Sequence, residues 1–471
     1  MTPGRARSRR RLPRALAVLG AALCALLTLS GCVSVVAGLP SPAAEPVDDA
    51  QDGQVPIVGA TGGPMDTLAR NALADLQTFW SQTLPQAYGE PFRPLAGGYF
   101  SIDPENVDRR DYPDGVGCGA RPADVENNAF YCQAQGQPHS DSISYDRRFL
   151  GELSDQYGRF IPALVMAHEF GHAVQARVGY PDVSIATETQ ADCFAGAWTR
   201  WVADGKSEHS TIRVPELDQV LRGFFLLRDP VGTSPSQQQA HGSYFDRVSA
   251  FQEGFDSGVP QCRDGFGADR VYTQGRFTSD QDFATGGNAP YTATKGIVDK
   301  SLPEFWTSAF TQVLHGTFTA PTIQPFSGSP PGCAPGDQWL VYCSDGKLVA
   351  YDEPELTRPA YNRIGDFAVV TAVSLPYALA ARDELGRSTG DAAAVRSAVC
   401  LTGWFSAQVY NGRLSSVKIS PGDLDESVSF LLQYGRNAQV LPDVGLTGFQ
   451  LVDLFRNGFL QGAAACDVGV G

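Results

Sequence analysis

The sequence has little positive charge, and this shortage narrows the range of partners that the protein can bind. Its 471 residues include 36 Lys and Arg against 51 Asp and Glu, for a formal charge of −15 at pH 7. Six of the Arg lie before residue 15, in a leader that is expected to be removed, which leaves the mature chain at about −21. A chain this acidic is not expected to bind nucleic acid or an anionic lipid surface as its main partner.

Long apolar runs are also missing, with one exception near the N-terminus. The run ALAVLGAALCALLTLS, residues 15–30, follows an Arg-rich start and is shorter than the ~20 residues that a membrane span needs. It predicts a signal peptide over residues 1–31. The segment ends in Leu29-Ser30-Gly31-Cys32, which resembles the lipobox of a bacterial lipoprotein, where the Cys is acylated and becomes the mature N-terminus.

We therefore expect an extracytoplasmic protein that is anchored to the cell membrane by a lipid on Cys32. Residues 32–63 are rich in Ala, Pro, Gly and Asp and predict a flexible tether. The alternative is a simple secretory signal with an incidental Cys. Ten Cys agree with an oxidising compartment. A hydrophobic content of 43% excludes global disorder.

Histidine is scarce, with six in the chain, yet two of them stand four residues apart. His168, Glu169 and His172 form the motif H-E-x-x-H within the apolar segment IPALVMAHEFGHAVQARVG. Four residues make about one helical turn, so both imidazoles project from the same helix face beside Glu169. This spacing predicts a Zn²⁺ site in which Glu169 takes a proton from water. The alternative is a helix with two surface histidines, which the apolar flanks argue against.

A site with two histidines needs a third protein ligand. The segment TETQADCFAGAW follows, with Glu188 and Asp192 one helical turn apart. Glu188 is the predicted third ligand, and Asp192 is predicted to accept the free ring N–H of a ligating His. The alternative is an ordinary helix N-terminus with Thr187 as the N-cap and acids favoured by the helix dipole.

These motifs resemble the bacterial neutral zinc metallopeptidases, a zincin family of extracytoplasmic proteins. The resemblance spreads over about residues 64–262 and closes with HGSYFDRVSAFQEGFDSG. It implies a helix-rich α+β fold and a peptidase in which His168, His172 and Glu188 bind one Zn²⁺ and Glu169 is the general base. In zincins the strand before the active-site helix is often an edge strand that pairs with the peptide substrate. The segment SISYD, residues 142–146, is expected to be that strand.

Catalysis also needs a group that stabilises the oxyanion of the tetrahedral intermediate. His241 is the tentative candidate, because it belongs to the segment that resembles the family. The alternative is that His241-Gly242-Ser243 caps a helix. Tyr145 is a weaker candidate.

Glycine, cysteine and aromatic residues of the first half recur in the second half at a nearly constant spacing. Phe79-Trp80 recurs 226 residues later as Phe305-Trp306, and Cys193 recurs 207 residues later as Cys400. The last matching residues recur at a spacing of 204: Phe251, Gly254, Phe255, Gly258 and Cys262 against Phe455, Gly458, Phe459, Gly462 and Cys466. Such a repeat predicts a tandem duplication.

The duplication divides the chain into a catalytic domain (64–262), a linker (263–291) and a second domain (292–471). At a spacing of 207, the positions of the three ligands, the general base and Asp192 hold apolar residues or Pro: Leu375, Pro376, Leu379, Val395 and Val399. The second domain is therefore predicted to be catalytically inactive. Pro376 is expected to kink or shorten its helix, since it removes a backbone donor.

Eight Cys remain once Cys24 of the leader and Cys32 are set aside, and the repeat selects one pairing among them. The predicted disulfides are Cys118–Cys132, Cys193–Cys262, Cys333–Cys343 and Cys400–Cys466. The alternative at Cys193 is a thiolate ligand of the metal. Its counterpart, Cys400, lies in the domain that lacks ligands, and this favours the disulfide.

The sequence thus predicts a membrane-anchored zinc metallopeptidase with one Zn²⁺ per chain and a peptide or protein substrate. Two alternatives stay open: a non-enzymatic envelope scaffold or binding protein with a vestigial zinc site, and a zinc amidase that acts on cell-wall material. The intact Glu169 favours an enzyme, because a purely structural site does not need a base.

Overall fold

Helices make up most of the chain that the computed structural model describes, residues 48–469, in agreement with the expected helix-rich α+β class. The predicted signal peptide and Cys32 lie outside the described residues. All described residues belong to one compact unit. None of their helices is both long and apolar enough to span a membrane.

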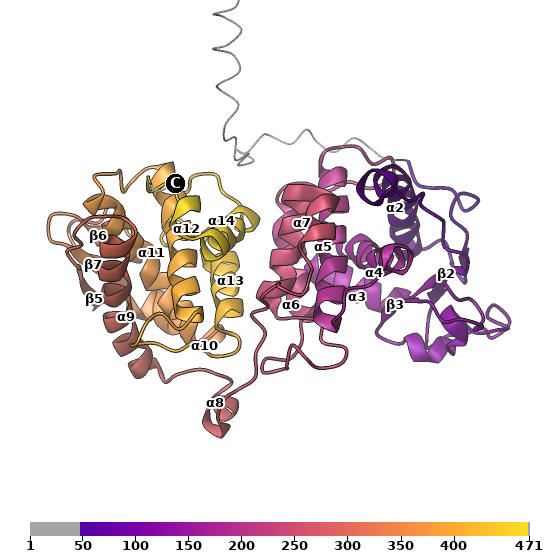
Figure 1. Cartoon of the computed structure of the whole chain (residues 1–471), viewed down its shortest axis with the longest axis horizontal. Coiled ribbons are helices and arrows are strands. Elements are labelled where there is room, and N and C mark those ends of the chain that lie inside the picture. The colour runs from indigo at the N-terminus through magenta and orange to yellow at the C-terminus, as the bar shows by residue number, and fades with distance from the viewer. Residues whose placement is uncertain (1–47, 470–471) are drawn as a thin grey trace, which may run out of the picture. The chain divides into compact units, whose positions relative to one another are not determined.

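Each half of the described chain places one long helix and a small sheet before its remaining helices (Figure 1). The elements of the first half are β1 (Ile57–Val58), α2 (Pro64–Tyr88), β2 (Gly98–Ile102), β3 (Ala129–Cys132), β4 (Ser142–Asp146), α3 (Arg147–Tyr157), α4 (Ile161–Val178), α5 (Ser184–Ala203), α6 (Glu216–Leu227) and α7 (Tyr244–Asp264). The predicted linker contains α8 (Asp280–Thr285). The second half contains α9 (Tyr291–Gln312), β5 (Thr322–Phe326), β6 (Leu340–Cys343), β7 (Leu348–Asp352), α10 (Arg358–Arg363), α11 (Asp366–Glu384), α12 (Ala392–Tyr410), α13 (Asp423–Tyr434) and α14 (Gly448–Gln461).

The strands of the first half form a sheet of order β1-β2-β4-β3. β4 pairs in parallel with β2 on one side and antiparallel with β3 on the other. The expectation that residues 142–146 form an edge strand is therefore wrong. β4 is central and buried along its whole length, and β3 is the edge strand next to it.

The outer edge of β3 pairs with no other strand among the described residues. Asp146 N–H donates to the carbonyl of Asn128, which sets the register of the hydrogen-bonded pairs between β3 and β4. In an antiparallel pair these alternate with pairs whose N–H and C=O point away from the partner strand. The N–H groups of Ala129 and Tyr131 therefore face the open side of the sheet.

The sheet of the second half has the order β5-β7-β6, with the same mixture of pairings. β7 is parallel to β5 and antiparallel to β6, as β4 is to β2 and β3. The four disulfides join the predicted Cys partners, with Cα–Cα distances of 5.9, 5.5, 5.8 and 5.2 Å in chain order.

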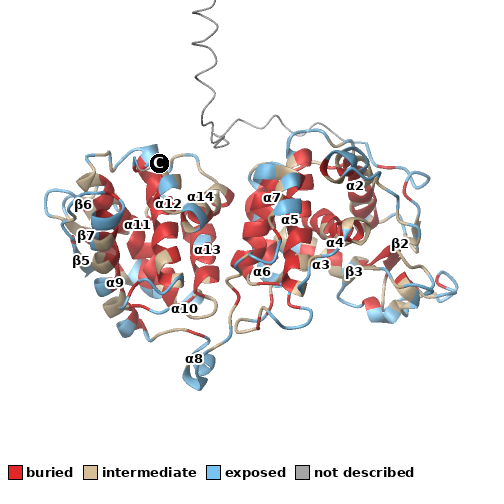
Figure 2. Cartoon of the chain, in the orientation of Figure 1, coloured by how far each residue is buried: buried red, intermediate tan, exposed pale blue. Residues whose placement is uncertain are grey.

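Glycines let two helices in each half touch along their backbones. A Cβ at Gly254 of α7 would lie 1.8 Å from the carbonyl oxygen of Cys193 in α5. In the second half, a Cβ at Gly458 of α14 would lie 1.8 Å from the carbonyl oxygen of Cys400 in α12. Only glycine fits at these crossings, and Figure 2 shows how much of α5 and α12 is buried.

Each half supplies a carboxylate to the N-terminus of the last long helix of the other half. At the start of α7, Phe245 N–H donates to Asp425 of α13 over 2.9 Å. At the start of α14, Gly448 and Phe449 N–H donate to Asp218 of α6 over 3.0 and 2.7 Å. Carboxylates stabilise helix N-termini, because the first N–H groups there lack intrahelical partners.

The prediction that Pro376 shortens its helix is wrong. α11 runs through Pro376 for 19 residues, against 18 residues in α4. Pro376 is buried within the helix. The packing of α11 against α12 and α13 offsets the cost of the missing backbone donor.

Candidate metal centre

Two adjoining helices of the first half bring the predicted metal ligands together. α4 is a largely buried helix that carries His168 and His172. α5 approaches it closely at Gly171, where a Cβ would lie 3.0 Å from the Cα of Ala191. This contact places Glu188, which precedes Ala191 by less than one turn, beside the two imidazoles.

The two imidazoles and Glu188 converge on one point. The Nε2 atoms of His168 and His172 are 3.2 Å apart. Glu188 Oε2 lies 3.3 Å from His168 Nε2, and Glu188 Oε1 lies 3.7 Å from His172 Nε2. One ligand atom from each residue lies within 4.8 Å of the others. Two imidazoles and one carboxylate form a donor set that catalytic zinc sites use, with a further position left open.

Asp192 holds His168 from the side away from this point, as predicted. His168 Nδ1 lies 2.8 Å from Asp192 Oδ1. Arg247 of α7 donates to both oxygens of Asp192, over 2.7 and 2.8 Å. Asp192 and Arg247 are almost completely buried, so their charges compensate each other within the protein.

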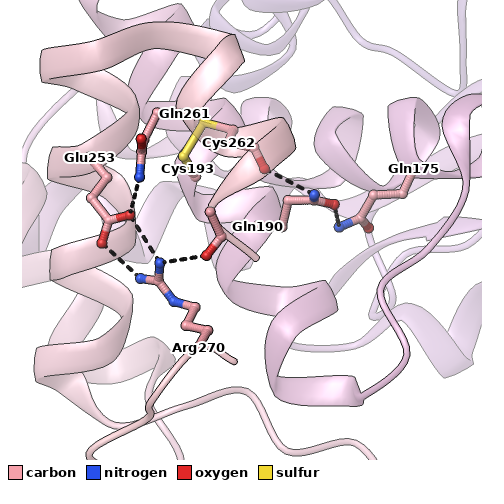
Figure 3. Close-up of a disulfide and its surroundings, with 8 residues drawn as sticks. Gln175, Gln190, Cys193, Glu253, Gln261, Cys262 and Arg270 are labelled. Atoms are coloured by element: carbon pink, nitrogen blue, oxygen red, sulfur yellow. Dashed lines mark hydrogen bonds and ion pairs between the residues drawn. A yellow bond between two sulfur atoms is a disulfide. The ribbon is translucent and has the colours of Figure 1, made fainter. Parts of the chain in front are cut away.

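Two side-chain amides connect His172 to a disulfide, and Figure 3 shows the part of this chain from Gln175 to Cys262. His172 Nδ1 lies 2.9 Å from Gln175 Oε1. Gln175 Nε2 donates to Gln190 Oε1 over 3.0 Å, and Gln190 Nε2 donates to the carbonyl of Cys262 over 3.0 Å. Cys262 is bonded to Cys193, the neighbour of Asp192. The disulfide therefore ties together the groups that orient both imidazoles.

Glu169 links the metal centre to the edge strand of the sheet. Its side chain is 8% exposed, and its Oε2 accepts a hydrogen bond of 2.7 Å from Tyr131 N–H of β3. Tyr131 N–H is one of the two backbone groups described above that face the open side of the sheet. The general base predicted from the sequence thus lies next to backbone that an extended peptide can pair with.

The surroundings shift the pKa values of the two glutamates in opposite directions. Burial raises the pKa of Glu169, and repulsion from Glu188 adds to the rise against the opposing effect of the histidines. Burial also acts to raise the pKa of Glu188, but hydrogen bonds from His168 and His172 outweigh it and lower this pKa far below its usual range. A lowered pKa keeps Glu188 anionic, as a ligand must be, whereas a raised pKa makes Glu169 a stronger base that can take up a proton.

His241 lies in the turn before α7 and meets Asp229 rather than the metal ligands. Its Nδ1 is 3.0 Å from Asp229 Oδ1, and its backbone N–H donates to Asp229 Oδ2 over 2.8 Å. Ser243 is the N-cap of α7 and forms a capping box with Asp246, so this segment caps a helix, as the alternative held. A Cβ at Gly242 would lie 3.3 Å from Thr189, which places the turn beside the start of α5.

Two other expectations near the site are corrected by the structure. Tyr145 is fully buried, and its hydroxyl donates to Asp66 over 2.9 Å in the core, so it does not face the metal centre. Thr187 is not an N-cap, because α5 begins at Ser184.

The corresponding positions of the second half form core. Leu375, Val395 and Val399 are at most 4% exposed, and Pro376 is buried with them. Leu379 is partly buried against the same cluster. These side chains offer no metal ligand.

Sequence reasoning missed several partners of the site: Tyr131, Gln175, Asp229 and Arg247. Gln175 follows His172 by three residues, a spacing that places both on one helix face and could have revealed it. Arg247 stands in the segment that resembles the family, but nothing in the sequence connects it to Asp192. Tyr131 acts through its backbone N–H, for which a sequence carries no signal.

Comparison with known proteins agrees with this geometry. Residues 112–266 match the family model described as "Putative neutral zinc metallopeptidase". An uncharacterized protein of Mycobacterium tuberculosis (strain H37Rv) is 29% identical over 204 residues, which cover 38% of this chain and 66% of the relative. The uncharacterized protein YpfJ of Escherichia coli K12 is 31% identical over 177 residues, which cover 31% of this chain and 56% of the relative.

The chain therefore spans about two thirds or less of the length of these relatives. No solved structure is significantly similar to it. The family match includes every residue of the candidate metal centre and its hydrogen-bond partners. Residues 112–266 thus show the resemblance to the neutral zinc metallopeptidases that the motifs indicated.

Proposed function

We propose that the first half of this chain is a zinc-dependent peptidase that hydrolyses peptide bonds outside the cytoplasm. The observation that carries the proposal is the convergence of His168, His172 and Glu188 within 4.8 Å, with Glu169 beside them. The family match over residues 112–266 supports the same reaction class.

The residues present fit one zinc ion. The Nδ1 atoms of His168 and His172 are engaged by Asp192 and Gln175, so both Nε2 atoms are left for the metal. Bound Zn²⁺ would polarise the scissile carbonyl and make water more acidic. No Cys competes as a ligand, because Cys193 is bonded to Cys262.

Glu169 is the proposed general base. It accepts a proton from the attacking water and delivers it to the leaving amine. The raised pKa of its carboxyl makes Glu169 a stronger base for the first step. The contact with Tyr131 N–H orients the carboxylate toward the open edge of β3.

The open edge of β3 is the proposed binding strand for substrate. An extended peptide can add to it through the backbone carbonyls of Ala129 and Tyr131, whose N–H groups donate to Asn128 Oδ1 and Glu169 Oε2. His241 is the proposed stabiliser of the oxyanion, because Asp229 fixes its ring from the Nδ1 side.

The second half is proposed to be a degenerate copy of the first, produced by tandem duplication. Three observations support this: the order β2-β4-β3, which matches β5-β7-β6, equivalent disulfides and the same glycine contacts between helices. Its ligand positions are apolar, so we assign the peptidase activity to the first half alone.

The whole chain is proposed to be a lipoprotein that is anchored through an acylated Cys32. The support for this is the Arg-rich start, the apolar run and the lipobox-like segment. Fractionation of cells that carry a Cys32→Ser variant tests it.

The activity is tested by metal analysis combined with a Glu169→Gln variant. We expect one Zn²⁺ per chain in both proteins, and a loss of about 10²–10⁴-fold in kcat/KM on peptides in the variant, because its amide cannot take up a proton. An exposed acid on α3 offers a matched control, Glu152→Gln, which should keep full activity.

Each rival function predicts a different result. Bound zinc without cleavage of a broad peptide library by the unmodified protein would contradict the peptidase and favour a binding protein. Cleavage of cell-wall amides without cleavage of peptides would instead favour an amidase.

A further inference from the structure

Three carboxylates of the second half meet at the starts of two helices, far along the chain from the candidate zinc ligands. They are Asp366 at the start of α11 and Asp423 and Glu426 in the first turn of α13. One oxygen from each lies within 4.8 Å of the others. Asp366 and Asp423 are 8% and 4% exposed, and Glu426 is half-buried.

The equivalent place in the first half has the same backbone geometry. Arg213 N–H donates to Glu216 Oε2 over 2.7 Å, and Ser420 N–H donates to Asp423 Oδ2 over the same distance, 207 residues later. A Cβ at Gly158 would meet Gln219, and a Cβ at Gly365 would meet Glu426, again 207 residues apart. The two places therefore differ in side chains rather than in framework.

The charges at these two places are opposite. In the first half, the guanidinium groups of Arg159 and Arg213 lie 3.2 and 2.9 Å from Glu216. In the second half, Asp366 stands in the place of Arg159, and Ser420 stands in the place of Arg213. Glu426 replaces the neutral Gln219. The first half thus has two cations around one carboxylate, whereas the second half has three carboxylates at the equivalent place.

No protein cation compensates this cluster in the described part of the chain. None of the ion pairs there involves Asp366, Asp423 or Glu426. Asp366 Oδ2 accepts from Ala289 N–H over 3.0 Å, but its Oδ1 is buried and has no hydrogen-bond donor among the described residues. A buried carboxylate oxygen without a donor is costly unless something binds it.

We propose that Asp366, Asp423 and Glu426 bind a hard divalent cation, Ca²⁺, that takes the place of the guanidinium groups of the first half. All three ligands are oxygens, which Ca²⁺ prefers and which do not suit zinc well. The ligands come from two helix starts, and Ca²⁺ tolerates irregular coordination better than Mg²⁺ does.

The site is accessible to solvent ions. Glu426 lines a cavity of about 630 Å³, which Asn288 and Arg363 also line. Arg228 on the same cavity wall is paired with Asp425. Asn288 Oδ1 accepts from Asp366 N–H over 2.8 Å, so a neutral oxygen lies close to the cluster as well. Water supplies the remaining ligands that Ca²⁺ requires.

The test is the melting temperature of the zinc-loaded full chain with and without Ca²⁺. We expect Ca²⁺ to raise it by several degrees, because a ligand that binds the folded state stabilises that state. Equilibrium dialysis should find one Ca²⁺ per chain. Asp366→Asn and Glu426→Gln should each reduce or abolish the shift, and Glu426→Gln restores the amide found at Gln219.

The control variant is Glu355→Gln, an exposed acid outside the cluster, which should keep the full shift. The shift should also persist in a His168→Ala background, which separates this site from the candidate zinc centre. The proposal is overturned if Ca²⁺ does not stabilise the unmodified chain, or if both cluster variants keep the full shift. An equal shift with Mg²⁺ would overturn the assignment to Ca²⁺.

Discussion

Asp192 meets positive or potentially positive groups on two sides, His168 and Arg247. Burial acts to raise the pKa of Asp192, but Arg247 and His168 outweigh it and lower this pKa below its usual value. The carboxylate therefore stays ionised and holds the His168 ring with Nε2 directed toward the other ligands. This is how a buried acid that never touches the metal can control its binding.

We predict that Asp192→Asn weakens zinc binding about 10–100-fold, because the amide orients His168 less well and leaves Arg247 without a compensating charge. Competition with a chelator of known affinity measures the change. Asp204→Asn, at the end of the same helix, is the control and should bind zinc normally. Unchanged affinity in Asp192→Asn would refute the role assigned to the carboxylate.

Single residues of the candidate site could be predicted where residues of a type that binds metal stand one helical turn apart. His168, Glu169 and His172 could be predicted because four residues make one turn, and Glu188 because a third ligand was required. Arg247 and Asp229 could not, since their contacts depend on how α7 and its preceding turn pack. The free backbone of Tyr131 depends on strand register, which no side chain of that strand reveals.

Among the elements, the helices could be predicted better than the sheet. Pro162, Gly179 and the spacing of the two histidines mark α4, whereas strand order depends on which segment returns beside β2. The parallel pairing of β2 with β4 made residues 142–146 central and left β3 at the edge. Pro376 shows that local preference is also a limited guide to helices. Proline disfavours the interior of a helix, but the packing around α11 outweighs this preference.

The contact between α7 and α14 contains two carboxylates that share one guanidinium. Arg456 of α14 lies 2.8 Å from Asp256 of α7 and 2.6 Å from Asp453 of its own helix. Burial and repulsion from Asp453 raise the pKa of Asp256 to about 7, against the opposing effect of Arg456. The folded chain thus keeps a proton on Asp256 at pH values where the unfolded chain has lost it.

A raised pKa of a carboxyl in the folded state means that stability falls as the pH rises from about 4 to about 7. We predict that Asp256→Asn removes this contribution, so the variant should gain melting temperature relative to the unmodified chain between pH 5 and pH 7.5. Melting curves across this range measure the difference. Asp345→Asn, an exposed control, should show no such trend. A difference that stays constant with pH would contradict the prediction.

For the whole molecule, the repeat in the sequence was enough to predict an arrangement of two halves. The order of the Cys in the repeat predicted the four disulfide partners, and the offset of 207 predicted the apolar ligand positions of the second half. It could not show that the halves cap each other's helices, because Asp218 and Asp425 carry no signal of the segment they contact. Nor could it show that the two halves share a backbone framework at the place where the second half has carboxylates at Asp366 and Glu426.

The location of the whole molecule is tested at Cys32. We predict that a Cys32→Ser chain leaves the membrane fraction and stays outside the cytoplasm, because a Ser at this position cannot be acylated as Cys is. Immunoblots of membrane, soluble and cytoplasmic fractions measure the distribution. Persistence of the variant in the membrane fraction would show that something other than this Cys anchors the protein.

The exchange of helix caps has a consequence for assembly. Asp218 and Asp425 make the contact self-complementary, in the manner of a two-fold dimer. The first half made alone would leave Asp218 without its backbone donors and Phe245 N–H at the start of α7 without its acceptor. Two such copies could satisfy both needs only by meeting in solution, which depends on concentration. The full chain carries its partner by covalent connection, so dilution does not cost it this contact.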